Sequence, residues 1–261
     1  MPNAAKHDAC VTAPAADPLA KLDAAVIAPR HARRYRAAAF QAYVLGAAVV
    51  FVVLAVAAHT IAYFPFDLTI THAVQAYHGQ VFDRLMFAVS WTGFFPQVAA
   101  LSTAVILALF FSGLRWEAVA TLFATLGSGV GAFIKLMVLR PRPSADVVHV
   151  FRMLQSSGFP SGHVLSVTAF CGFLVFLAFT LFKSSVARTA AIVVLSVFIA
   201  SMSVSRIYLG QHWFSDVMGA YLFGSLWLAL TIRVYLWGKA RYFVHQPVAA
   251  ALPAAPVPGP A

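Results

Sequence analysis

The sequence has 261 residues, of which 61% are hydrophobic and only 10% are charged, and its mean hydropathy is +0.83. Soluble domains are typically about 45–50% apolar and about 25% charged, so this composition excludes an ordinary water-soluble protein. The net charge of +10 is better explained by membrane topology than by nucleic acid, and two cysteines, Cys10 and Cys171, suit neither a disulfide framework nor a thiolate metal site.

Both ends of the chain lack hydrophobic periodicity and are predicted to be tails. Residues 1–36 are rich in alanine, proline and charge, and we expect a mostly disordered cytoplasmic tail. It does not resemble a cleavable signal peptide, because no apolar core closely follows the first charges. Residues 246–261 form a Pro/Ala-rich segment that is expected to be flexible. The membrane domain is therefore expected to cover residues 37–245.

Between the tails, six apolar segments approach the ~20 residues that a transmembrane helix needs. The sequence therefore predicts an all-α integral membrane bundle of six transmembrane helices. Gly93 and Pro96 interrupt the start of the second segment, so residues 66–90 are predicted to form a separate, partly amphipathic helix at the interface. The glycines of the GSGVG run at 127–131 are expected to allow close helix packing. The six predicted spans are approximately 40–63, 94–113, 117–138, 163–182, 188–206 and 214–236.

Basic residues predict the orientation of these spans, because cytoplasmic loops are enriched in lysine and arginine. If both termini are cytoplasmic, 12 of the 18 basic residues lie inside, including the ARRYR cluster just before the first span. Five of the six outer cations gather in two short outer segments and at nearby helix ends. A bound anion would explain cations on the disfavoured side. These five are Lys135, Arg140, Arg142, Arg152 and Arg206.

Three polar motifs lie at the outer ends of the predicted spans. In chain order they are KLMVLRPRP at 135–143, PSGH at 160–163 and SRIYLGQHWFSD at 205–216. Two spans separate the second motif from the third, so these two share one side of the membrane. A short polar loop joins the first motif to the second. We therefore expect all three motifs to open on one surface.

The cations and the helix start in these motifs favour a phosphate ligand. Lys135, Arg142 and Arg206 can bind and neutralise phosphoryl oxygens, the guanidinium groups in bidentate fashion. Ser161 and Gly162 begin a helix, where unpaired N–H groups and the helix dipole attract an anion. Glycine also lets the backbone approach the ligand closely.

The two histidines and the aspartate favour phosphoryl transfer. His212 and Asp216 are one helical turn apart, so the carboxylate can accept from one ring nitrogen while the other attacks. His163 is then free to donate a proton to the leaving oxygen. No carboxylate cluster accompanies the motifs. The sequence therefore predicts a phosphatase without a metal site and without a cofactor.

The three motifs together resemble the type 2 phosphatidic acid phosphatase superfamily, whose relatives include vanadium haloperoxidases and glucose-6-phosphatase. The family signatures K-x6-RP, PSGH and SR-x5-H-x3-D match this chain in full, and the resemblance covers roughly residues 40–240. It implies a six-helix membrane bundle whose site lies near the outer membrane surface. It further implies that His212 attacks phosphorus, Asp216 orients it, and His163 protonates the leaving alkoxide. The residues implied to hold the phosphate are Lys135, Arg142, Ser161, Gly162 and Arg206.

The remaining polar residues of the outer side receive weaker interpretations. Arg140 and Arg152 are expected to contact lipid headgroups or a second phosphate of the substrate. His59, late in the first span, is expected to snorkel or to hydrogen-bond near the interface. No catalytic or metal-binding role is expected for the other histidines, and no catalytic role for the outer aspartates. These are His72, His78 and His149, and Asp67, Asp83 and Asp146.

The sequence thus predicts a lipid phosphate phosphatase of a bacterial inner membrane, with its site facing the periplasm. The substrate is expected to be phosphatidate, phosphatidylglycerol phosphate or undecaprenyl diphosphate, because the motifs bind the phosphoryl group that all three share. A lipid phosphotransferase, a lipid A phosphatase and a non-catalytic lipid-binding protein remain alternatives. A haloperoxidase is disfavoured, because those relatives are generally soluble. The sequence does not indicate an oligomeric state.

Overall fold

The computed structural model describes residues 30–77 and 79–243, and within them every regular element is a helix. The all-α prediction is therefore confirmed. α2 begins before the predicted tail boundary at residue 36, and the rest of both predicted tails lies outside the described residues. In chain order the elements are α2 (Arg30–Thr60), α3 (Pro65–Gln75), α4 (Gln80–Thr92), α5 (Gln97–Phe111), α6 (Arg115–Val138), α7 (Gly162–Leu181), α8 (Val186–Tyr208), α9 (Phe214–Gly238) and the π-helix η1 (Lys239–Phe243).

The chain divides into two compact units, residues 1–45 and residues 46–261. The described part of the first unit is the beginning of α2. All other helices, and every residue of the candidate site, belong to the second unit.

Among the described residues, five helices are each long and apolar enough to cross a membrane. α4 and α5 pass the same test only as a pair, which is bent by 61° at its break. Counting this pair as one span gives six, in agreement with the sequence. The five single spans are Arg34–Thr60, Arg115–Val138, Gly162–Leu181, Val186–Tyr208 and Phe214–Tyr242.

The second span differs from its prediction. α5 has only 15 residues, which rise about 22 Å at 1.5 Å per residue and fall short of a hydrocarbon core about 30 Å thick. α5 is long and apolar enough to cross a membrane only when it is counted together with α4. The prediction of one interfacial helix over 66–90 is therefore wrong: this segment forms α3 and α4, and Gly79 lies at the N-terminus of α4.

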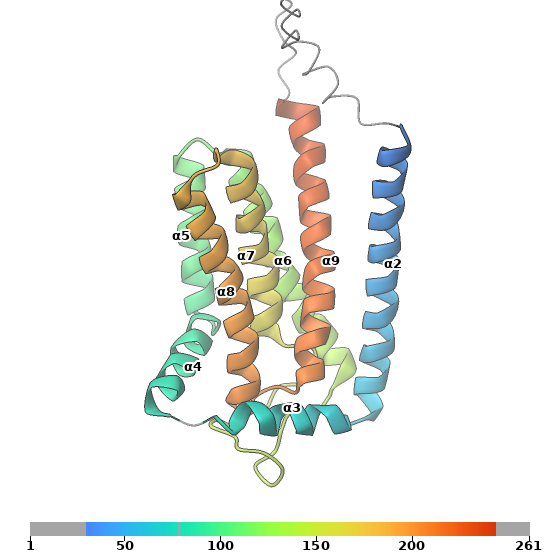
Figure 1. The fold of residues 1–261 in the computed structure, drawn as a ribbon, viewed down its shortest axis with the longest axis vertical. Helices are drawn as coiled ribbons and strands as arrows, with labels where there is room; N and C mark the ends of the chain where they lie inside the picture. Colours follow the sequence, from blue (N-terminus) through green and yellow to red (C-terminus); the bar gives the residue numbers. More distant parts are fainter. Residues whose placement is uncertain (1–29, 78, 244–261) are drawn as a thin grey trace, which may run out of the picture. The chain divides into compact units, whose positions relative to one another are not determined.

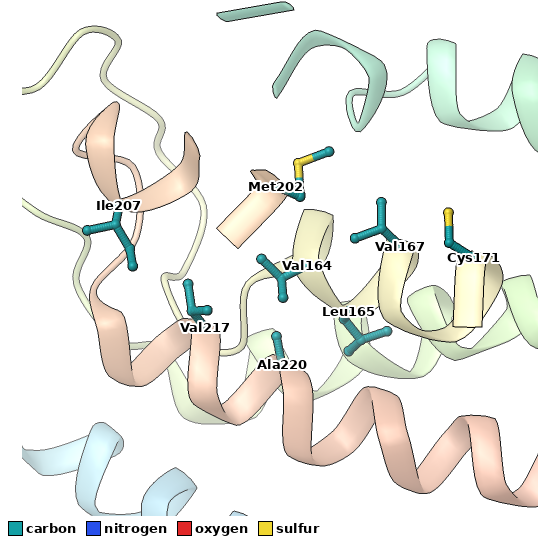
Figure 2. Packing of buried hydrophobic residues seen from close by; sticks show 8 residues of the cluster. All are labelled: Val164, Leu165, Val167, Cys171, Met202, Ile207, Val217 and Ala220. Carbon is teal, nitrogen blue, oxygen red and sulfur yellow. The ribbon is translucent and has the colours of Figure 1, made fainter. Parts of the chain in front are cut away.

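α7 is the central helix of the second unit and packs against α6, α8 and α9 (Figure 1). Figure 2 shows eight buried side chains that fill the space between α7, α8 and α9. They begin at Val164, directly after the PSGH motif, so the core fixes the start of α7. Cys171 is a buried free thiol in this cluster and serves packing.

Glycines allow α6 to approach its neighbours closely. A Cβ added to Gly127 would lie 2.6 Å from Trp227, and one added to Gly131 would lie 2.7 Å from Leu165. The expected role of this glycine run is confirmed for these two residues. A Cβ on Gly129 would meet nothing within 4 Å.

Two features fix the polypeptide around the three motifs. α3 lies across the ends of α8 and α9 that carry the third motif (Figure 1). The loop before α7 packs on the α8–α9 turn, where Phe151 N donates to Leu209 O at 3.2 Å. Gly210 in that turn has φ +63°, and an added Cβ would lie 2.1 Å from His149 O. Only glycine fits this turn, because it tolerates positive φ and leaves room for the loop.

Candidate active site

The three motifs converge at one end of the helices, as the sequence predicts for their shared surface. Lys135 extends from the last turn of α6 and its Nζ donates to Ser157 O at 2.8 Å and to Gly158 O at 3.3 Å. These carbonyls belong to the segment that leads into α7. The lysine therefore joins the end of α6 to the entrance of the PSGH motif.

The start of α7 presents polar groups without protein partners. Ser161 is the N-cap residue, yet its buried Oγ makes no hydrogen bond. Nε2 of His163, in the first turn, is also buried and unpartnered. The last four carbonyls and first four N–H groups of a helix lack intrahelical partners. An anion at this helix start would use the serine hydroxyl, the free N–H groups and the positive end of the dipole.

Arg206, at the end of α8, is fully buried but only partly satisfied. Its Nη1 donates to Ser90 Oγ of α4, whereas Nε and Nη2 have no hydrogen-bond partner. Its guanidinium group also stands 5.5 Å from the ring centroid of Phe94. A buried cation with two unused donors indicates a binding place for an anion, since unsatisfied buried polar groups are costly.

Arg142 links the loop to the α8–α9 turn. Its Nη1 donates to Gln211 O at 2.7 Å and contacts Nε2 of His212 at 3.1 Å. Its Nε and Nη2 donate to Ser156 O and Ser156 Oγ at 2.6 and 2.9 Å. Because arginine can only donate, Nε2 of His212 accepts this bond and is unprotonated. The ring proton then lies on Nδ1.

His212 and Asp216 face each other across the first turn of α9. Nδ1 of His212 lies 3.4 Å from Oδ2 of Asp216, close enough for an ion pair but without hydrogen-bond geometry. Oδ2 also accepts from Trp213 N at 3.0 Å. Burial, followed by the nearby cations Arg142, Lys135 and Arg206, holds the pKa of His212 well below its ordinary value. The imidazole is therefore neutral, as a nucleophile must be.

His163 lies beside the break between α4 and α5. A Cβ on Gly93 would be 2.3 Å from the His163 ring, and the rings of Phe94 and His163 meet edge to face with centroids 4.7 Å apart. Beyond Phe94 and Ser90 opens a cavity of about 680 Å³. Its wall is largely apolar and also includes Arg152 and Gln211; the aromatic members are Phe87, Trp91, Phe94 and Phe95.

The structure corrects two predictions outside the motif set. Arg140, expected at lipid headgroups or a second phosphate, is 1% exposed and donates to Asp216 Oδ1 at 2.6 Å. Asp67, expected in an outer loop, is buried in α3 and pairs with Arg140 at 3.0 Å. Sequence reasoning missed this pair because an arginine beside Pro141 and an acid near a helix start are both typical of solvent-exposed positions.

Other polar residues do not belong to the predicted catalytic and phosphate-binding set. His59 hydrogen-bonds through Nδ1 to Val138 O at 3.0 Å, as expected for a histidine late in the first span. Asp83 accepts from the hydroxyl of Tyr208. Ser90 and Gln211 also lie beside the site. Sequence analysis missed them because neither is a specified position of the three signatures. Among the described residues, no three histidine, cysteine or acidic side chains gather in a way that could hold a metal ion.

Comparison with known proteins places these observations in a family. The family model described as PAP2 superfamily matches residues 98–239. Phosphatidylglycerophosphatase B of Bacillus subtilis (strain 168) is 28% identical over 183 residues, which are 67% of this chain and 86% of that protein. Human sphingosine-1-phosphate phosphatase 2 is 32% identical over 109 residues, or 39% of this chain; the match spans only 26% of the human protein.

Two solved structures share the fold. The crystal structure of a transmembrane PAP2 type phosphatidylglycerolphosphate phosphatase from Bacillus subtilis matches with a TM-score of 0.66 and 22% identity, covering 77% of this chain and 99% of the other. The crystal structure of Aquifex aeolicus LpxE matches with a TM-score of 0.53 and 17% identity, covering 65% of this chain and 96% of that one. At these identities the similarity supports the helical arrangement.

Proposed function

Because the chain belongs to the PAP2 superfamily of membrane lipid phosphate phosphatases, we propose that it hydrolyses a phosphomonoester or diphosphate of a lipid through a phosphohistidine. In this proposal, Nε2 of His212 attacks phosphorus while the bond to the leaving oxygen breaks. His163 gives that oxygen its proton. Water then attacks the phosphohistidine, with His163 as the base, and releases inorganic phosphate.

The unpartnered donors around His163 and His212 carry this proposal. Nε and Nη2 of Arg206, Nε2 of His163 and Oγ of Ser161 are all buried without a hydrogen-bond partner. They come from α7 and α8. A phosphoryl group supplies several acceptor oxygens at once and would satisfy this set. Lys135 and Arg142 add positive charge next to it, and Gly162 completes the helix start.

The same cations support a mechanism without a metal ion. Phosphoryl transfer depends mainly on positioning and on neutralising the charge of the equatorial oxygens. Elsewhere a divalent metal contributes that charge. Here Lys135, Arg142 and Arg206 can contribute it, while Asp216 keeps the proton of His212 on Nδ1.

The cavity beside His163 supports a lipid as the leaving alcohol. In an in-line displacement the leaving group departs opposite the nucleophile, on the side of its proton donor. On that side Phe94 separates His163 from the aromatic cavity of about 680 Å³. Its apolar wall suits the glycerol and upper acyl region of a lipid. Phosphatidate and phosphatidylglycerol phosphate carry such a region, whereas undecaprenyl diphosphate would place a polyprenyl phosphate there as its leaving group.

The site is proposed to face the periplasm of a bacterial inner membrane. The positive-inside pattern predicts that both termini are cytoplasmic, and the motifs lie at the opposite ends of the spans. A substrate can then keep its acyl chains in the outer leaflet while its headgroup reaches the site. Transfer of the phosphoryl group to a second lipid, and action on lipid A, are the alternative reactions of the same site.

Phosphate release from the purified protein in detergent, measured on a panel of these lipid phosphates, tests the function. We expect activity to persist in EDTA and to fall with vanadate, which adopts the five-coordinate geometry of phosphoryl transfer. A second acceptor lipid in the assay separates hydrolysis from transfer. A strict requirement for a divalent metal ion would refute the mechanism, and no release from any member of the panel would refute the function.

A further inference from the structure

A buried network joins Asp216 to Asp67, which lies outside the three motifs, and to Arg140, a position that the K-x6-RP signature leaves unspecified. Arg140, in the loop after α6, donates through Nη1 to Asp216 Oδ1 and Ser215 Oγ, each at 2.6 Å. Its Nη2 donates to Asp67 Oδ2 at 3.0 Å and its Nε to Ala62 O at 3.1 Å. The side chains of Asp67, Arg140 and Asp216 are all 0% exposed.

Asp67 closes this network into a ring. Its Oδ1 accepts from Ser215 N at 2.8 Å, and its Oδ2 accepts from Ser215 Oγ at 2.7 Å and from Phe64 N at 3.0 Å. Phe64 also places its ring 5.2 Å from the Arg140 guanidinium group. Each nitrogen of the Arg140 guanidinium group therefore has a partner, and these partners come from α3, α9 and the segment before α3.

The network leaves the two oxygens of Asp216 with different tasks. Oδ1 is occupied by Arg140, and Oδ2 points to Trp213 N and to Nδ1 of His212. Rotation of the carboxylate would break both contacts. The ring also determines the charge beside His212. One guanidinium group is shared between two carboxylates, so the formal charges of Asp67, Arg140 and Asp216 sum to one negative charge.

We propose that Asp67 and Arg140 form a positioning pair that fixes the orientation and the effective charge of Asp216 and so sets the basicity of His212. The pair touches neither substrate nor phosphate. This inference rests on the proposed role of His212 as the nucleophile. The charged or titratable groups that face His212 from the surrounding elements are Lys135 on α6, His163 on α7, Arg206 on α8, Asp216 on α9 and Arg142 in the loop.

Opposite shifts in two variants test the proposal. In Asp67→Asn, Arg140 has only the carboxylate of Asp216 left to pair with and neutralises it more completely. The negative charge that stabilises protonated His212 is then weaker. The acid limb of kcat/KM, which reports the protonation of His212, should move to lower pH. Arg140→Gln removes the cation from Asp216, so the limb should move to higher pH. In both variants kcat should fall about 10- to 100-fold, the range typical for the loss of hydrogen-bond partners that orient metal-binding side chains.

The double variant separates charge from structure. Asp67→Asn/Arg140→Gln removes one charge of each sign, so the acid limb should return close to that of the unmodified protein while kcat stays low. Asp146→Asn is the matched control, because Asp146 is an exposed carboxylate of the same outer loop and should move neither quantity. If Arg140→Gln does not fold, Arg140→Lys keeps the charge but cannot bridge two carboxylates, and kcat should fall with the limb in place.

The titration of His212 itself provides a readout without catalysis. Histidine-selective 15N NMR in detergent, assigned with His212→Ala, should give the same order of pKa values: Asp67→Asn lowest and Arg140→Gln highest. If activity and thermal stability fall together in Asp67→Asn and in Arg140→Gln, the two variants that change charge, while their acid limb and His212 pKa stay fixed, the pair is only structural and the proposal is wrong. If the unmodified protein and the variants are active but neither the acid limb nor the His212 pKa moves, only this inference is refuted. If the unmodified protein is inactive but the His212 pKa still moves in the variants, only the proposed function is refuted.

Discussion

The contact between Arg142 and His212 decides which ring nitrogen can react. Arg142 Nη1 lies 3.1 Å from Nε2, and an arginine has no acceptor, so Nε2 keeps its lone pair. The proton then lies on Nδ1, whose nearest carboxylate oxygen is Asp216 Oδ2 at 3.4 Å. The site therefore presents the tautomer that nucleophilic attack through Nε2 requires, before any substrate arrives.

The buried position of His212 predicts activity that extends into acidic solution. Burial and the surrounding cations hold its pKa well below the ordinary value of 6.5. Protonation, which would remove the attacking lone pair, then occurs only when the pH falls through that lowered pKa. We expect the acid limb of kcat/KM to lie below pH 6.5 in an assay on detergent-solubilised phosphatidate. An acid limb at or above this value would mean that substrate access or another group controls it.

The two catalytic histidines should differ in their dependence on the leaving group. His212→Ala removes the nucleophile and should abolish activity on every substrate. His163→Ala removes the proton donor, and general acid catalysis contributes about 10²–10⁴-fold, roughly 3–5 kcal/mol of barrier. An alkoxide from phosphatidate needs most of that help, and a nitrophenolate needs little.

Rates of both variants on phosphatidate and on nitrophenyl phosphate make this comparison. His163→Ala should retain far more of its activity on the aryl phosphate than on the lipid. Equal losses on the two substrates would show that His163 binds phosphate or shapes the site, and its role as the acid would have to be abandoned.

Single residues also show where the sequence is informative and where it is not. The three motifs identify side chains whose chemistry and spacing belong together, and the structure brings all of them to one end of the helices. Asp67 and Arg140 are 73 residues apart in the chain, and neither has an oppositely charged residue three or four positions away. Their pairing depends on where α3 packs against α9, and local spacing carries no information about such a contact.

At the scale of elements, the break between α4 and α5 has a similar explanation. Gly93 and Pro96 mark its position in the sequence. However, the apolar residues of 66–90 do not reveal that α4 is separate from α3 and forms a bent pair with α5. The break matters for the site, because Ser90 from the end of α4 receives the hydrogen bond of Arg206, and Gly93 and Phe94 lie against His163. The bent pair therefore forms one wall of the candidate site.

The glycines of α6 give a matched test of helix packing. Gly131→Leu would drive a side chain into Leu165 of α7, because even a Cβ there would be 2.7 Å away. Overpacking of this kind costs about 1–3 kcal/mol. Gly129→Leu, two residues earlier on an open face, should be tolerated. Thermal unfolding in detergent should show a lower midpoint temperature for Gly131→Leu only. Equal midpoints for the two variants would mean that close packing of α6 on α7 at Gly131 does not contribute to stability.

At the scale of the whole molecule, the spans and the cations together predict the orientation. Within the described residues, six spans, counting α4 and α5 as one, would return the chain to its starting side. Most basic residues are predicted to lie on that side, and the exceptions include four that contact the candidate site or its buried network. These four are Lys135, Arg140, Arg142 and Arg206. Their contacts with carbonyls, Asp216 and the α8–α9 turn account for cations on the side that the positive-inside rule disfavours.

Cysteine labelling in cells tests this orientation. In a Cys10→Ser/Cys171→Ala background, single cysteines replace Ala145 and Gln155 at the motif end and Ser112 and Ser184 at the opposite end, all of them exposed positions. An impermeant maleimide added to intact spheroplasts should label positions 145 and 155, because the site is proposed to face the periplasm. Positions 112 and 184 should react only after lysis, which also serves as the control for reactivity. Labelling of 112 and 184 before lysis, with 145 and 155 protected, would place the site in the cytoplasm, where its substrate would have to come from the inner leaflet.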